Sequence, residues 1–263
     1  MQFNFDKQHV MVSGGSKGIG LACAKAFFNE DAFVTIISRN QDNLNQAIID
    51  ISGQSQHCRL NAISANLSDA NQALEALDLA EKRFGQVVVL INSSGAAKRV
   101  GPDDLTPHAW QASMEAKFYP YIHLIDPVIK RMANHGSGNI INIIGNGGKI
   151  AKPVHISGGS ANAALMLASN GLAAAYASRG VRVNAINPGI TLTGRLDGLI
   201  EAQSKQSGKS KLEVLTEFTN DIPMGRLANP EEIAQVALFL ASPLASYVTA
   251  NIITMDGAMH PII

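Results

Sequence analysis

Ser13-Gly14-Gly15-Ser16-Lys17-Gly18-Ile19-Gly20 is the stretch of sequence that decides the fold of this chain. It follows the short apolar run His9-Val10-Met11-Val12 and opens an apolar-periodic segment from Ile19 to Phe28. A strand, a glycine turn and a helix in that order form an anion site, because the backbone approaches a phosphate closely and the helix N-terminus directs N–H groups at it. A glycine repeat alone is weak evidence, but the position of this one between a strand and a helix strengthens it.

Apolar runs alternate with amphipathic segments along the whole chain. Strands are expected near residues 9–13, 33–38, 57–64, 86–92, 138–144, 181–187 and 251–255. Helices are expected near residues 18–29, 40–52, 69–84, 106–134, 155–179 and 230–241. This alternation predicts an α/β fold: a doubly wound sheet of about seven parallel strands in three layers, joined by right-handed helical crossovers.

The chain of 263 residues is expected to form one domain that spans residues 1–263, since it shows neither a linker nor an internal repeat. Its one irregular region is about 190–228, which carries the polar run 203–211. We interpret this region as a mobile segment that covers a substrate. A solvated surface insertion is an almost equally good interpretation.

Charge and composition argue against several classes of function. Lys plus Arg and Asp plus Glu both number 21, so the formal net charge is zero, which argues against nucleic acid or a membrane surface as the main partner. The sequence shows no secretory signal layout and no apolar run near the ~20 residues of a membrane span. Cys23 and Cys58 have no metal-ligand spacing and are expected to be buried free thiols. We therefore predict no metal and a cytoplasmic location.

Further motifs follow the glycine stretch in a fixed order. They are Asn92-Ser93-Ser94-Gly95 after an apolar run, Val181 to Gly189 with Thr193 beyond it, Pro230-Glu231-Glu232-Ile233-Ala234, and Met255-Asp256-Gly257. Together they resemble the short-chain dehydrogenase/reductase family over nearly the whole chain. That resemblance implies a Rossmann-type fold, a nicotinamide dinucleotide cofactor, a small-molecule substrate and a homo-oligomer, either a tetramer or a dimer. The apolar helices 106–134 and 155–179 and the apolar C-terminal segment 259–263 favour a homotetramer.

The resemblance also implies which residues bind the cofactor. They are Ser13, Gly14, Ser16, Lys17, Gly18, Ile19 and Gly20 in the glycine loop, Asn66 and Leu67 beside the adenine, Asn92, Ser93 and Gly95 after the fourth strand, and Pro188, Gly189 and Thr193. Enzymes that use NAD place a carboxylate at the end of the second strand, but here that strand ends Ser38-Arg39. Arg39 and Lys17 together suit a 2′-phosphate, which favours NADP(H); as an alternative, both are ordinary surface cations.

The catalytic residues of the family are changed in this chain. Aligned on the strand end and on Ala163-Ala164-Leu165, the family's Ser, Tyr, Lys and Asn positions hold Gly145, Gly158, Asn162 and Lys117. Lys117 stands in the family's Asn position and Asn162 in its Lys position, on helices that are neighbours in the family's fold. We interpret the pair as exchanged. A minority branch of the family is similar here, with a Tyr seven residues before the Asn, where this chain has His155.

His155 is therefore the best candidate for a proton donor. An imidazole titrates near ~6.5, and reduction of a carbonyl needs one proton for the developing alkoxide. A surface histidine in a loop is an equally good interpretation. The glycines at 145, 147, 148, 158 and 159 remove side chains from the cleft wall, which predicts space for a bulkier substrate; plain loss of function is the alternative.

Two hypotheses follow for the function. The first is an NADPH-dependent oxidoreductase that reduces a carbonyl or another polarised double bond, with His155, Lys117 and Asn162 as an altered proton relay. The second is a non-catalytic NADP(H)-binding protein that acts as a sensor or a partner subunit. The Lys117/Asn162 exchange favours the enzyme, because a pure binding protein has no need for an ammonium group at that position.

Overall fold

Seven parallel strands form one sheet in the computed structural model, which describes residues 3–95 and 97–261. Their order is β3-β2-β1-β4-β5-β6-β7. The strands are β1 (His9–Ser13), β2 (Phe33–Ser38), β3 (Leu60–Ser64), β4 (Val87–Asn92), β5 (Gly138–Ile143), β6 (Val181–Pro188) and β7 (Ile252–Met255). The predicted doubly wound sheet is confirmed. The last two residues of the apolar C-terminal segment, 262–263, lie outside the described part.

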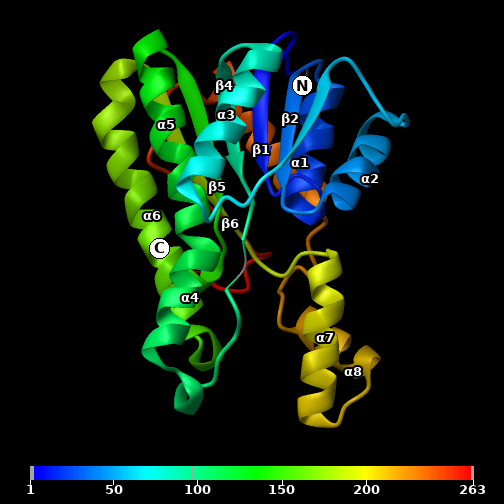
Figure 1. Cartoon of the computed structure of the whole chain (residues 1–263). Coiled ribbons are helices and arrows are strands. Elements are labelled where there is room, and N and C mark those ends of the chain that lie inside the picture. Colours follow the sequence, from blue (N-terminus) through cyan, green and yellow to red (C-terminus); the bar gives the residue numbers. More distant parts are fainter. Residues whose placement is uncertain (1–2, 96, 262–263) are drawn as a thin grey trace.

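Helices cover both faces of the sheet (Figure 1). Helices α1 (Gly18–Asn29), α2 (Gln41–Ser52) and α9 (Pro230–Ala241) pack on one face, and α3 (Ala70–Phe84), α5 (Tyr119–His135) and α6 (Ile156–Tyr176) pack on the other. Val10 and Val12 of β1 contact the first group, whereas Met11 between them faces the second, because successive strand residues point to opposite faces. Apolar runs in the strands are thus explained by burial on both sides.

The strand order reverses at β1, which lies between β2 and β4. A crevice opens at the carboxyl ends of the strands at such a point. The glycine loop that follows β1 fits there only without side chains: a Cβ on Gly20 would lie 2.2 Å from the Gly14 carbonyl oxygen, and one on Gly14 would lie 2.7 Å from that of Ser93. The fold therefore brings β1, the start of α1 and the end of β4 into backbone contact.

The prediction of a single helix at 106–134 is wrong, because the chain forms two helices there. Helix α4 (Pro107–Lys117) ends before Phe118, and α5 starts at Tyr119 with Pro120 in its first turn. Pro120 has no N–H to donate to the Ala116 carbonyl, so the first helix cannot continue. The Ala116 oxygen packs instead against Gly95, where a Cβ would come within 2.1 Å of it. The break makes Lys117 the last residue of its helix.

The irregular region 190–228 contains two helices that the sequence pattern did not indicate. Helix α7 (Gly194–Ser207) and helix α8 (Lys211–Asn220) form a hairpin around an apolar cluster of their own. Leu196, Ile200, Val214, Ile222 and Leu227 are its buried members. The polar run 203–211 contains the end of α7, the turn at Gly208 and the Ser210 capping box of α8. Its polarity belongs to helix ends exposed to solvent.

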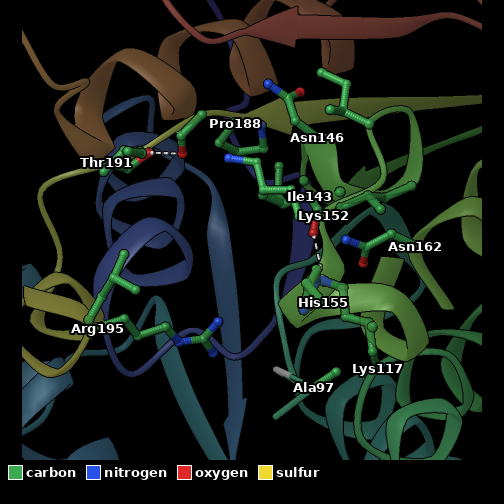
Figure 2. A pocket seen from close by; sticks show the side chains of 18 of the residues that line it. Ala97, Lys117, Ile143, Asn146, Lys152, His155, Asn162, Pro188, Thr191 and Arg195 are labelled. Atoms are coloured by element: carbon green, nitrogen blue, oxygen red, sulfur yellow. Dashed lines mark hydrogen bonds between the residues drawn. The ribbon is translucent and has the colours of Figure 1, made fainter. Parts of the chain in front are cut away.

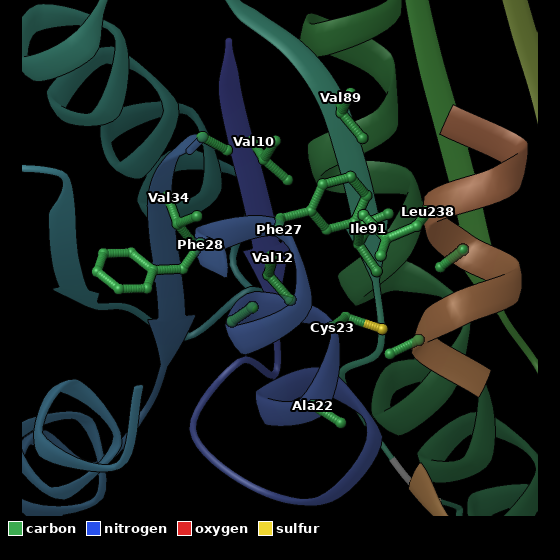
Figure 3. Close-up of a cluster of buried hydrophobic side chains, with 14 of the residues drawn as sticks. Val10, Val12, Ala22, Cys23, Phe27, Phe28, Val34, Val89, Ile91 and Leu238 are labelled. Carbon is green, nitrogen blue, oxygen red and sulfur yellow. The ribbon is translucent and has the colours of Figure 1, made fainter. Parts of the chain in front are cut away.

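Figure 3 shows Cys23 buried among Val12, Phe27 and Leu238, as expected of an apolar thiol. Cys58 is exposed in the turn before β3, so its predicted burial in a strand is wrong; the strand begins later, at Leu60. Among the described residues, no helix is long and apolar enough to cross a membrane.

Candidate active site

Two hollows meet at the carboxyl ends of the strands. The first, the cofactor hollow, lies between the glycine loop and the residues that follow β2, β3 and β4. The second, the reaction pocket, lies between the residues that follow β5, the start of α6 and the segment from Pro188 to Leu199. Both are lined by Ile19, Ser93, Gly95, Thr193 and Arg195. A ligand that fills the first hollow therefore reaches the second.

Most of the predicted cofactor residues line these hollows. Gly14, Ser16, Lys17, Gly18, Ile19, Arg39, Asn66, Leu67, Ser93, Gly95 and Thr193 line the cofactor hollow, and Pro188 and Gly189 line the reaction pocket. Ser13, Gly20 and Asn92 line neither and are buried beside them. Gly20 supports the loop by its close approach to Gly14, so its place near the cofactor is structural.

Ser13 and Asn92 belong to a chain of buried hydrogen bonds that crosses the sheet. Ser13 Oγ donates to Asn92 Oδ1 at 3.1 Å, Asn92 Nδ2 donates to Asn142 Oδ1 at 3.0 Å, and Asn142 Nδ2 donates to Ser169 Oγ at 2.9 Å. We call this the Ser13–Ser169 chain. It links β1, β4, β5 and α6, and its side chains satisfy one another, as buried polar groups require. These bonds join the three strands to one another and to α6.

The cofactor hollow is suited to phosphate. Lys17 precedes α1 in an extended conformation and makes no side-chain cap, so the first N–H groups of that helix remain available to an anion. Arg39 follows β2, whose terminal Ser38 is bonded to Ser16 of the glycine loop at 2.9 Å. In the described part of the chain, neither Lys17 nor Arg39 forms a salt bridge. The residues present thus fit a dinucleotide with an additional phosphate on its ribose.

Lys117 is buried at the end of α4 and lines the reaction pocket. Its Nζ donates to Tyr121 Oη at 2.9 Å and to the Ile143 carbonyl at 3.2 Å, and the Tyr121 hydroxyl donates to the same carbonyl. Burial, with a smaller contribution from Arg195, lowers the pKa of Lys117 to about 7. Lys117 can therefore gain or lose a proton near neutral pH, whereas a lysine on the protein surface stays protonated there.

His155 lines the reaction pocket (Figure 2), and its ring packs against Gly147 and Gly158. A Cβ on Gly158 would lie 2.2 Å from His155 Cε1, and one on Gly147 would lie 2.9 Å from its Cδ2. The Nδ1 atom is buried and has no hydrogen-bond partner within the described structure. Burial, followed by Arg99, Lys117 and Lys152, lowers the pKa of this imidazole. The ring faces the pocket and is not a surface loop residue.

The glycines at 145, 147, 148, 158 and 159 leave less open space in the reaction pocket than the sequence indicated. His155 occupies the room beside Gly147 and Gly158. A Cβ on Gly148 would lie 2.7 Å from Ala163 N, and one on Gly159 would lie 2.6 Å from the Gly147 oxygen. These four glycines let two backbone segments and one imidazole pack together. Gly145, whose Cβ would be 3.7 Å from Asn162 Nδ2, remains the position with open space.

Asn162 and Lys117 line the same pocket on two helices, α6 and α4, that pack against each other. Asn162 is buried near Gly145 and Gly147, but its side chain makes no direct hydrogen bond to Lys117 in the described structure. Ser157 is bonded to Ser113 at 2.8 Å between these helices and holds them together. Lys117 and Asn162, which we interpret as an exchanged pair, thus line one pocket without a direct hydrogen bond in the described structure.

Sequence reasoning missed Tyr121, which is bonded to Lys117, and three cations of the pocket lining. In the single helix expected at 106–134, Tyr121 was one more apolar position, although a spacing of four residues would place it on the same face as Lys117. The three cations that line the pocket are Arg99, Lys152 and Arg195. Each lies in a different segment, so only the folded chain brings them together. Within the described residues, no group of three His, Cys, Asp or Glu side chains is placed to hold a metal ion.

The family model described as enoyl-(acyl carrier protein) reductase matches residues 14–260. The NADPH-dependent reductase BacG of Bacillus subtilis (strain 168) is 31% identical over 95% of this chain and 97% of its own. The crystal structure of YwfH, an NADPH-dependent reductase involved in bacilysin biosynthesis, superposes with a TM-score of 0.91 at 29% identity and covers 98% of this chain and 100% of its own.

A third relative has an unusual active site of its own. It is a short-chain oxidoreductase of Pseudomonas aeruginosa PAO1 that contains an atypical catalytic centre, solved with NADPH bound. Its TM-score is 0.89 at 26% identity, and the match covers 99% of this chain and 100% of that one. These matches extend over the whole fold and include both hollows.

Proposed function

The chain belongs to the short-chain dehydrogenase/reductase family, and we propose that it reduces a carbonyl or another polarised double bond through an altered proton relay. Its similarity to NADPH-dependent reductases identifies it as an NADPH-dependent oxidoreductase. The cofactor hollow fits NADP(H), because the start of α1 has no side-chain cap and Lys17 and Arg39 line the hollow. Bound NADPH would supply the hydride. The protein's own residues must then supply one proton to the substrate oxygen.

The observation that carries the proposal is the position of His155 over Gly158. The family's Tyr position holds Gly158, and the imidazole fills the space in which a side chain there would begin. In this proposal His155 is the proton donor, and Asn162, whose Nδ2 would lie 3.4 Å from a Cβ on Gly147, orients the substrate or a water. The atypical catalytic centre of the Pseudomonas aeruginosa relative supports the idea that this fold tolerates such a rearrangement.

Lys117 has a second role in the proposal. Its ammonium group, with a pKa of about 7, carries positive charge toward the pocket at slightly acid pH and is neutral above. A nearby positive charge stabilises a developing alkoxide. We propose that Lys117 assists the proton transfer electrostatically and is held for this by Tyr121 and the Ile143 carbonyl.

The α7–α8 hairpin is proposed as the segment that covers the substrate. Leu196 and Leu199 of α7 line the reaction pocket, and the base of the hairpin is closed by a parallel bridge between Thr191 and Ala228. An apolar surface over the pocket would exclude water from the reacting atoms.

The test is NADPH oxidation against a panel of aldehydes, ketones and enones, run beside a titration of NADPH binding. Turnover of any member that depends on His155 supports the reductase. Tight NADPH binding with no turnover across the panel favours the alternative, a non-catalytic NADP(H)-binding protein. Absence of NADPH binding contradicts both.

We also propose that the protein is a homotetramer. Trp110 of α4, Tyr119 of α5 and Leu167 of α6 are exposed on the helical layer that includes α4–α6, Leu167 to 77%. An exposed apolar face of this kind favours association. Light scattering at micromolar concentration should show a mass about four times that of one chain, and Leu167→Glu should reduce it, with the exposed Leu79→Glu as the control. A monomeric wild type would contradict the proposal.

A further inference from the structure

The lining of the reaction pocket carries an excess of positive charge. Its charged lining residues are Arg99, Lys117, Lys152 and Arg195, and the lining within the described part of the chain includes no Asp or Glu. The whole chain, in contrast, has equal numbers of acidic and basic residues, 21 of each. The acidic residues are therefore placed elsewhere, and the pocket is positive by its local arrangement.

Three of these cations lie at the rim and have no carboxylate partner. Arg99, Lys152 and Arg195 are exposed, and none of them forms a salt bridge within the described structure. Arg195 instead lies near the Gly95 carbonyl, at 3.4 Å. Elsewhere on the surface some arginines are paired, as Arg131 is with Asp78 and Glu81 at 2.6 Å, while others, such as Arg39, form no salt bridge in the described structure. The rim is distinguished because three cations without a carboxylate partner line one pocket.

Arg99 and Lys152 are brought together by the backbone. Val100 N donates to the Val154 carbonyl at 3.2 Å, which joins the loop after β4 to the segment before α6. His155 N donates to the Lys152 carbonyl at 2.8 Å. These two bonds place Arg99 and Lys152 beside the imidazole. Figure 2 shows the Lys152 and Arg195 side chains extending into the space between the two walls of the pocket.

The electrostatic effect of this arrangement already appears at His155. After burial, the causes that lower the pKa of His155 are Arg99, Lys117 and Lys152. Arg195 likewise contributes to the lowered pKa of Lys117. Each cation raises the free energy of the others, so an anion that enters the pocket relieves repulsion as well as forming its own contacts.

The cofactor accounts for part of the charge but not all of it. Arg195 lines both hollows, so the phosphates of the dinucleotide compete for it. Arg99 and Lys152 line the reaction pocket and not the cofactor hollow. These two cations are therefore available to bind the substrate.

We propose that the substrate is an anionic carbonyl compound, whose carboxylate or phosphate binds between Arg99 and Lys152 while its carbonyl faces His155. The inference rests on the proposed function and names its substrate class. Arg99 offers a forked pair of donors that suits either oxyanion, and Lys152 adds a point charge.

The experiment uses two matched pairs of probes on the full chain. The carboxylate pair is 2-oxo-4-phenylbutanoate and its ethyl ester, and the phosphate pair is dihydroxyacetone phosphate and dihydroxyacetone. For each probe, kcat/KM with NADPH and the dissociation constant from the complex with NADP+ are measured. The variants are Arg99→Gln/Lys152→Gln and, as the control, Lys149→Gln, a nearby lysine outside the pocket lining that lies 3.4 Å from Thr254 Oγ1.

At least one anion should bind about tenfold or more tightly than its neutral partner, and the double variant should lose that preference while its NADPH affinity is kept. The pair that shows the preference identifies carboxylate or phosphate. Equal binding within both pairs, or an equal loss for neutral and anionic probes in the double variant, overturns the proposal. If no probe is reduced, the proposed function is in doubt, yet the binding constants still decide whether the pocket selects anions.

Discussion

The cofactor hollow and the reaction pocket share five lining residues but are built on different principles. In the cofactor hollow, Gly14 is required because backbone approaches backbone: an added Cβ would meet a carbonyl oxygen at 2.7 Å, and one on Gly20, which supports the loop from behind, would meet the Gly14 oxygen at 2.2 Å. In the reaction pocket, Gly158 instead makes room for one side chain, that of His155. Contacts between main-chain atoms determine the shape of the first hollow at Gly14, whereas the His155 side chain determines that of the second at Gly158.

This difference has an electrostatic side. The cations that line the cofactor hollow, Lys17, Arg39, Lys98 and the shared Arg195, are all exposed. In the reaction pocket, a buried lysine and a half-buried histidine lie within reach of one another's charge. The reaction pocket should therefore change its protonation near neutral pH.

The largest effect that tests this comparison is expected for His155→Ala. Loss of a positioned acid should reduce kcat about 10²–10⁴-fold, with NADPH affinity unchanged, because His155 does not line the cofactor hollow. Since the His155 pKa lies below its ordinary value, the acid form increases as pH falls, and the wild-type rate of reduction should rise with it. His135→Ala, at the exposed end of α5, is the control. A twofold loss would exclude His155 as the proton donor.

Arg39→Ala should show the opposite pattern. Loss of a charge-assisted contact costs ~1.5–3 kcal/mol, so NADPH should bind about tenfold to a hundredfold more weakly while NADH binding and kcat at saturation change little. Fluorescence titrations with both cofactors measure this, and Arg59→Ala, which removes an arginine that bonds the Phe28 carbonyl outside both hollows, is the control. Equal affinity of the wild type for NADPH and NADH would remove the argument from Arg39.

Lys117 should give the folded protein a stability that depends on pH. Its pKa is about 7 when folded and ~10.4 when unfolded, so between these values the unfolded chain binds the additional proton and stability rises with pH. Relative to Lys117→Met, the wild-type free energy of unfolding should gain ~2 kcal/mol from pH 7 to pH 9. Urea unfolding at both pH values measures it. Lys149→Met should follow the wild type; an unchanged difference between wild type and Lys117→Met would mean that Lys117 is not buried as described.

The smallest effect comes from two glycines of the same helix, α6. Gly171 has nothing within 4 Å of an added Cβ, so Gly171→Ala should stabilise the protein by ~1 kcal/mol. Gly158→Ala places its Cβ against His155, so it should stabilise less and should reduce kcat by moving the imidazole. Thermal unfolding and steady-state rates of the two variants separate these outcomes. Identical behaviour of both would show that His155 does not rely on Gly158.

The strands and the glycine loop could be predicted because their signals are local. Each strand is one apolar run, and the loop is one stretch of glycines whose spacing follows from backbone contact. The break before Tyr119 was also visible in principle, since Pro120 interrupts the helix, but the apolar pattern on both sides looked continuous. Helix α7 was missed because its last turn is polar in sequence and includes the exposed Lys205 and Ser207.

The reaction pocket was only partly predictable. His155, Lys117 and Asn162 were found by comparison with the family's motif and line the pocket, while their catalytic roles stay predictions. No local sequence pattern distinguishes Arg99, Lys152 or Arg195 from other exposed cations, because each lies alone in its own segment. The convergence of Arg99 and Lys152 depends on a backbone bond between Val100 and Val154, residues too far apart in sequence for any periodic pattern to connect.

The Ser13–Ser169 chain consists of two hydroxyls and two amides and holds no group that gains or loses a proton near neutral pH. It therefore insulates the scaffold from the acid–base state of the pocket beside it. Lys117 contacts the sheet at the Ile143 carbonyl, at the end of β5, whereas the side-chain bonds that join β1, β4 and β5 to one another keep the same charge when Lys117 and His155 titrate. The molecule thus places its proton-exchanging groups beside interstrand bonds that do not exchange protons near neutral pH.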